Sequence, residues 1–162
     1  MGALQAGRHL PTLLLAIMAI SLTANPAGAK DGVCREGNCE NGRGRFEYDS
    51  GMVYSGDWRK GMEHGRGSMT APGGARYEGE YRDGLPHGSG SYSLPDGRRY
   101  IGEWKKGQPH GQGIETQPTG ISYEGQWRDG KPHGRGTTRR DGTIDQDGYW
   151  QEGKFIGKDT PR

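Results

Sequence analysis

Four histidines recur 23 residues apart and are the first residues in this chain that could do chemistry: His64, His87, His110 and His133. Histidine is a common metal ligand. If each copy forms a β-hairpin, equivalent residues lie two strands apart, about 9–10 Å at ~4.8 Å per strand. Zinc holds imidazole nitrogens at ~2.0–2.1 Å, so neighbouring histidines cannot readily share an ion. We expect each histidine to pack beside the following glycine and shape a turn, with no metal and no cofactor.

Carboxylates offer a second chemistry, general acid–base catalysis. Glu78 and Glu80 are two residues apart in an extended segment, about 6.6 Å, which overlaps the lower end of the separation found in inverting glycosidases. Their face is polar, with no sign of the burial that would split their pKa values. The chain also lacks a phosphate-binding loop with its lysine and a nucleophile elbow. The sequence therefore predicts a protein that is not an enzyme.

Two cysteines, Cys34 and Cys39, lie in a short loop of sequence CREGNC. In an oxidising compartment such a pair is typical of a structural disulfide. A ring this small is worth roughly 2 kcal/mol, enough to hold a first hairpin that would otherwise fray. A zinc site would need two further nearby ligands, and a reactive redox pair is the remaining alternative.

The N-terminus has the three parts of a secretory signal peptide. A weakly basic start containing Arg8 precedes the apolar segment Leu13–Leu22, and small residues end at Ala29. The apolar segment is about half of the ~20 residues that a membrane-spanning helix needs. We therefore predict a signal-peptide helix within residues 1–29, cleavage near Ala29, and a mature protein that is periplasmic or extracellular.

These residues belong to a unit repeated every 23 residues, which is typical of a repeat protein. Fuller copies start at residues 54, 77, 100 and 123, and a degenerate copy starts at 146, giving an array over residues 54–157. Residues 30–53 form a partial first copy that contains the cysteines, and residues 158–162 form a tail. Atypical end copies are expected, since they cap a stack of repeats.

The alternation of residues within a copy predicts β-strands. Tyr100, Gly102 and Trp104 alternate with Ile101 and Glu103, which gives one aromatic and one mostly polar face. The glycine leaves a gap that we expect a ring from the neighbouring strand to fill. A turn over residues 105–109, with proline fixing the bend, leads to His-Gly-x-Gly and a weaker strand over about 114–117. The mature chain is therefore predicted to be an all-β meander of hairpins.

The run YxGxWxxGxxHGxG resembles the MORN (membrane occupation and recognition nexus) repeat. It is found at Tyr54–Gly67, Tyr100–Gly113 and Tyr123–Gly136, and with Tyr81 in place of Trp at Tyr77–Gly90. The resemblance covers most of the mature chain. It implies an elongated, single-layer antiparallel sheet of successive hairpins and a binding or scaffolding role, with phospholipid head groups or proteins as partners. The first and last copies depart from the motif, so no role is carried over to Asn41 or Gln146.

Nine aromatic residues occupy two fixed positions of the repeat, and we call them the aromatic ladder. They are Tyr54, Trp58, Tyr77, Tyr81, Tyr100, Trp104, Tyr123, Trp127 and Trp150. One interpretation is that the rings form the core of the sheet. The other is that a single layer leaves some rings exposed, where they bind a protein segment or stack against a glycan of the cell envelope.

Basic residues follow the second aromatic of each copy: Arg59, Arg82, Lys105 and Arg128. They are expected to be solvated charges at turns. The alternative is contact with anionic lipid head groups, worth about 1 kcal/mol per basic residue, although acidic residues lie between them. The net charge of only +2 argues against nucleic acid as a partner.

The sequence as a whole favours an exported binding or scaffold module that recognises a protein partner through a repetitive β surface. Alternatives are binding of anionic phospholipid head groups or of envelope glycans. The ends of an open sheet present unpaired backbone groups, so pairing of two chains end to end as a homodimer is a further possibility.

Overall fold

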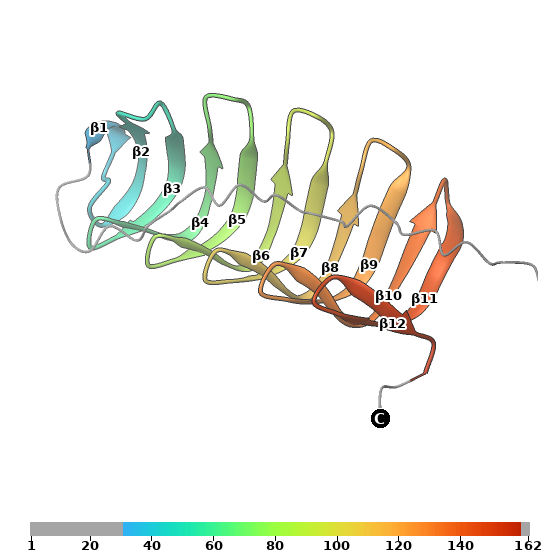
Figure 1. The fold of residues 1–162 in the computed structure, drawn as a ribbon. Helices are drawn as coiled ribbons and strands as arrows, with labels where there is room; N and C mark the ends of the chain where they lie inside the picture. Colours follow the sequence, from blue (N-terminus) through green and yellow to red (C-terminus); the bar gives the residue numbers. More distant parts are fainter. Residues whose placement is uncertain (1–30, 160–162) are drawn as a thin grey trace, which may run out of the picture.

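The computed structural model describes residues 31–159, which form one antiparallel sheet of twelve strands in sequence order (Figure 1). The strands are β1 Gly32–Gly37, β2 Gly42–Tyr48, β3 Val53–Arg59, β4 Met62–Thr70, β5 Arg76–Arg82, β6 Leu85–Ser93, β7 Arg99–Lys105, β8 Gln108–Thr116, β9 Ile121–Arg128, β10 Lys131–Arg140, β11 Thr143–Gln151 and β12 Lys154–Gly157. The predicted all-β, single-layer meander of hairpins is thereby confirmed. The predicted signal-peptide helix and the end of the predicted tail lie outside the described residues, and within these residues no helix is long or apolar enough to cross a membrane.

The turns that close the hairpins are tighter than the sequence suggested. Between β7 and β8 the turn consists of Lys106 and Gly107, with φ of 50° and 81°. Two consecutive positive φ angles define the type I′ turn, whose twist matches that of the flanking strands. The expected turn over residues 105–109 is therefore too long. Pro109 lies inside β8, buried and opposite Trp104, so it continues the strand and does not bend the chain.

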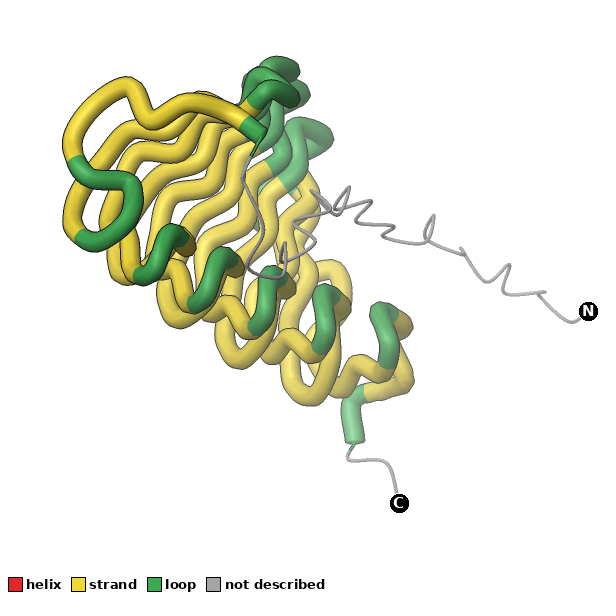
Figure 2. The backbone as a smooth tube through the Cα atoms, turned by 90° about the vertical axis from the view of Figure 1, so that its left-hand side faces the viewer, coloured by secondary structure: helices red, strands yellow, loops and turns green. Residues whose placement is uncertain are grey.

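The His-Gly-x-Gly sequence forms a bulge within a strand and not a turn, which corrects our expectation for the histidines. In β7 and β8, Gly102 pairs with Gly113 and the next residue, Glu103, pairs with His110. Two residues of β8 therefore have no counterpart on β7, and the first of them, Gly111, has a φ of +61°. Bulges bend a strand and increase its twist. Figure 2 shows the hairpins curving alike along the array, with their bends aligned.

Each tyrosine that begins a copy lies flat over two glycines. A Cβ atom added to Gly113 would lie 2.3 Å from the hydroxyl oxygen of Tyr100, and one added to Gly102 would lie 2.6 Å from it. The gap at the glycine is thus filled by a ring of the same strand, and the expectation of a neighbouring strand's ring was wrong. The hydroxyl then donates a hydrogen bond to the carbonyl of Glu103 at 2.9 Å, which satisfies its polar end.

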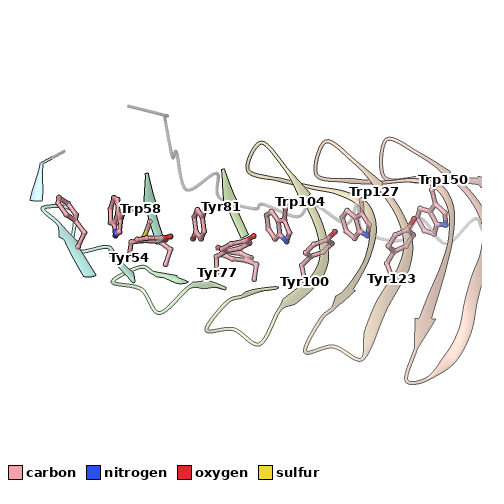
Figure 3. Packing of buried hydrophobic residues seen from close by; sticks show 12 residues of the cluster. Tyr54, Trp58, Tyr77, Tyr81, Tyr100, Trp104, Tyr123, Trp127 and Trp150 are labelled. Carbon is pink, nitrogen blue, oxygen red and sulfur yellow. The ribbon is translucent and has the colours of Figure 1, made fainter. Parts of the chain in front are cut away.

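Edge-to-face contacts join these tyrosines to the second aromatic of each copy along the whole array (Figure 3). The Tyr100 ring lies 5.2 Å from Trp104 of its own copy and 5.1 Å from Trp127 of the next. The indole of Trp104 donates to the carbonyl of Gly90 at 3.2 Å. Aromatic pairs of this geometry contribute about 0.5–1.5 kcal/mol each beyond the area they bury. The series of contacts runs from Phe46 to Phe155 and holds consecutive hairpins together.

Candidate binding surfaces of the sheet

The aromatic ladder is buried throughout. None of its nine side chains is more than 6% exposed, and Tyr54 is fully covered. Burial also raises the pKa of the tyrosine hydroxyls, as at Tyr81. The rings cover one another's faces and lie against glycine backbone, so a second layer is not needed to exclude water. The interpretation of the ladder as core is therefore correct, and the expectation that some of its rings are exposed is wrong.

A third buried row was missed by the sequence analysis. It consists of Phe46, Met69, Tyr92, Glu115 and Thr138, spaced 23 residues apart and all at most 8% exposed. The common period was a usable signal, but the residue types differ too much to be recognised as one position. Glu115 stands out because its carboxyl lies 3% exposed, with Oε2 lacking a hydrogen-bond partner in the described part of the chain. Burial raises its pKa to about 7.

The opposite face of the sheet, which we call the open face, carries a shallow groove of about 770 Å³. Four glycines line it, one from each of β4 to β7: Gly67, Gly79, Gly90 and Gly102. Small or polar side chains of the alternating positions complete it, including Ser68 and Ser91. A hollow of about 330 Å³ shares Arg43 and Ser55 with the groove and extends it to β1. The groove thus crosses several strands along the long axis of the sheet.

Two carboxylates that line the groove accept backbone hydrogen bonds but form no ion pair. Glu80 accepts the backbone N–H of Ser89 at 3.1 Å, and Glu103 accepts that of Gln112 at 2.9 Å. Neither forms an ion pair with another residue of 31–159. At the other end of the groove, Arg43 lies 3.2 Å from Asp57. Toward β5–β7 the groove therefore carries two carboxylates without ion pairs, with Arg66 of β4 opposite the first of them, Glu80.

The repeat identified in the fold also matches a known family. The MORN repeat family model matches residues 54–76, 77–98, 100–122 and 123–144, together more than half of the chain. The chain belongs to the MORN-repeat family. MORN repeats are generally associated with binding to membranes, lipids or proteins and are typically non-catalytic modules. A search of curated proteins found no match to this chain.

The basic residues of the MORN repeats lie at the hairpin turns and differ in their contacts. Arg59 forms an ion pair with Asp83 of the next repeat at 3.0 Å. No ion pair involves Arg82, Lys105 or Arg128 within residues 31–159. Three of the four basic residues considered for head-group contact therefore form no ion pair there, although the charge of Arg128 still helps to lower the pKa of Glu152. Arg59 is already paired.

The MORN-repeat histidines lie at the bulges, close to acids of the following turn. The Nδ1 atom of His64 lies 3.8 Å from Asp83, and His110 and His133 have equivalent acids at 3.9 and 3.7 Å. His87 differs from the other three histidines, because Lys106 occupies the repeat position at which they have an aspartate or glutamate. Burial and the charges of Arg82 and Lys105 lower the pKa of His87. No group of three or more metal-ligating side chains lies together among the described residues.

The first hairpin of the sheet, which precedes the residues matched by the MORN family model, is cross-linked as the sequence predicted. Cys34 of β1 and Cys39 of the turn are joined by a disulfide with a Cα–Cα distance of 6.0 Å. The bond closes a ring at the outermost strand of the sheet, where β1 is mostly exposed and pairs on one side only. It therefore limits fraying of the strand that has the fewest neighbours.

Proposed function

We propose that this protein is an exported, non-enzymatic binding module whose open face holds an extended segment of a protein partner. The observation that carries the proposal is the difference between the two faces. One face is closed by buried rings, whereas the other has a long groove lined by glycine, serine and charged side chains. Binding by this protein is therefore assigned to the open face and not to the aromatic ladder.

The dimensions of the groove suit an extended polypeptide. It spans β2 to β7, five strand intervals or about 24 Å, which corresponds to roughly seven residues of extended chain. Such a segment would run across the strands. Because the interior strands are already hydrogen-bonded on both sides, recognition would use side chains on the open face and not addition of a strand.

Export is supported by the N-terminal sequence and by the cysteine pair. The sequence of residues 1–29 has the features of a cleaved leader, and disulfides persist in oxidising compartments. The Cys34–Cys39 bond is consistent with a periplasmic or extracellular protein. Determination of the mature N-terminus by mass spectrometry checks this part of the proposal: a chain that retains residues 1–29 would contradict it.

The groove is tested by photo-cross-linking in the cell of origin. A photoreactive residue replaces Ser91 in the groove, and a matched variant carries it at Gly73, in an open loop with nothing within 4 Å. We expect a protein adduct from position 91 and not from position 73. The adduct is identified by mass spectrometry, and the purified partner must then bind saturably in calorimetry. Equal adducts at both positions, or none, would refute a protein-binding groove.

Binding of anionic lipid is the second candidate, because Arg82, Lys105 and Arg128 project from successive turns without ion pairs in the described residues. Co-sedimentation of the mature protein with anionic and neutral vesicles at two salt concentrations tests it. Salt-reversible pelleting with anionic vesicles alone, abolished by replacing the three residues with glutamine, would support this candidate. Pelleting unaffected by these substitutions would contradict it.

Glycan binding and self-association are less well supported. The glycan hypothesis depended on exposed rings, and their burial removes that basis. Association end to end would join the free edges of β1 and β12, which are the two edge strands of the sheet. Light scattering of the mature protein decides between a monomer and a dimer, and a molar mass of one chain at all concentrations would exclude the dimer.

A further inference from the structure

The repeat allows one position to be compared in four copies of the same protein. On the open face, the residues directly opposite each other in each copy are Ser55 and Ser68, Glu78 and Ser91, Ile101 and Ile114, and Glu124 and Thr137. Only the third of these four pairs is aliphatic. Its two side chains are 49% and 42% exposed, so the repeat is broken by an apolar pair in contact with solvent.

The fold does not require this pair. The other copies form the same hairpin with serine, threonine or glutamate at the two positions, and the rings that hold the hairpins together lie on the other face. Adjacent exposed aliphatic side chains, rimmed by polar residues, are typical of interaction sites. Ile101 also lines the groove, which places the pair at the end of the surface assigned to binding.

Carboxylates lie on two sides of the aliphatic pair. Glu103 follows Ile101 by two residues on the same face of β7, and Glu124 of β9 lies directly opposite Ile114. Glu80 lines the adjoining part of the groove. None of these three carboxylates forms an ion pair within residues 31–159. The nearest cation along β7, Arg99, lies on the side of Ile101 away from Glu103. On the groove side, Arg66 of β4 lies opposite Glu80 without forming an ion pair with it, so Glu103 and Glu124 are the carboxylates next to the pair that have no cation opposite them.

We propose that Ile101 and Ile114, with Glu103 beside them and Glu80 in the adjoining part of the groove, bind a protein segment in which an aliphatic side chain lies next to a lysine or arginine. The aliphatic side chain covers the isoleucines, and the cation lies between the two groove carboxylates. The inference rests on the proposed protein-binding groove and adds the chemistry of its ligand. Opposite charges across such a surface favour the right partner and speed association.

The protein itself supplies matched variants. Serine occupies both isoleucine positions in the first full copy, so I101S/I114S replaces the pair by residues that this hairpin accepts. For the carboxylates, Gln126 stands at the equivalent position of the fourth copy and accepts the Arg135 N–H at 2.9 Å. The E80Q/E103Q variant therefore removes two charges while keeping both hydrogen bonds, and both variants are expected to fold.

The test is an NMR titration of the mature protein with three decapeptides in a serine-glycine frame. The probe carries Lys-Leu-Pro-Leu-Lys at its centre, and the controls carry Glu for Lys or Ser for Leu. Proline keeps the peptides extended. We expect shifts of the β5–β8 amides around the groove with the probe alone. The serine variant is expected to weaken binding about tenfold, and the glutamine variant is expected to remove most of its salt dependence.

Four results would overturn the inference. With the unmodified protein they are equal shifts with the glutamate peptide, shifts confined to the turns, and no shift at millimolar peptide. The fourth is unchanged affinity of both variants. If position 91 still cross-links a partner that binds saturably, the protein-binding groove stands and only the ligand chemistry assigned to it is wrong. If neither experiment gives binding, the proposed function itself fails.

Discussion

Replacement of Glu115 by glutamine is expected to stabilise the protein at neutral and alkaline pH but not in acid. The carboxyl is 3% exposed and lies between two tyrosine-bearing strands, opposite Tyr100 and Tyr123. Burial raises its pKa from 4.5 to about 7. Each pKa unit corresponds to 1.36 kcal/mol, so keeping this group ionised costs about 3 kcal/mol of folding free energy.

The sign follows from the direction of the shift. Below pH ~4.5 the carboxyl is protonated in both the folded and the unfolded chain, and no cost arises. Between about 4.5 and 7 the unfolded chain releases its proton first, so stability falls as the pH rises, and above about 7 the loss is complete. The amide of the E115Q variant does not titrate in this range, so the free energy of unfolding of this variant lacks the pH-dependent loss caused by ionisation of Glu115.

Urea unfolding followed by tryptophan fluorescence measures the effect at pH 4, 5.5, 7 and 8.5. The difference between E115Q and the wild-type protein is expected to be near zero at pH 4 and about 3 kcal/mol at pH 8.5. The E115M variant is a second test, because Met69 occupies the same position two copies earlier. A difference that is independent of pH would show that Glu115 does not titrate in this range and would refute the reasoning.

Three further predictions address the turns, the rings and the first hairpin. Gly113→Ala should lower the free energy of unfolding by at least about 2 kcal/mol, since its Cβ would collide with a buried ring, whereas Gly73→Ala, with open space around it, should change it little in the same urea titration. Lys106→Asp should raise the pKa of His87, measured by NMR, because it restores the acid found beside the other histidines; an unchanged value would contradict the role of charge. Cys34→Ser should increase hydrogen exchange in β1 alone, and faster exchange throughout the sheet would disagree.

The periodic aromatics made much of the fold predictable. Alternation at Tyr100, Gly102 and Trp104 identified the strands, and the fixed period identified the meander of hairpins. The backbone geometry inside each hairpin was harder to predict from the sequence. Nothing in the sequence of His110–Gly113 distinguishes a turn from a bulge, because glycine permits positive φ in both. The choice depends on how Tyr100 packs over the two glycines, which is a tertiary effect.

The candidate site was only partly predictable for a related reason. The sequence places Tyr and Trp on one face but does not say whether they cover each other. That outcome depends on the edge-to-face geometry and on the indole hydrogen bond, such as that of Trp104. The open face was overlooked because its residues vary between copies. Ile101 and Ile114 become informative only once the register shows that they lie opposite each other.

The order of the strands has a consequence for how the chain folds. Every strand pairs with the strand that precedes or follows it in sequence, so no contact in the sheet has to wait for a distant segment. Loop closure is correspondingly inexpensive, and proteins dominated by local contacts fold fast for their size. Each hairpin can pair with the preceding hairpin as soon as its own two strands have formed. The array can therefore assemble hairpin by hairpin from its cross-linked N-terminal end, before the rest of the chain has folded.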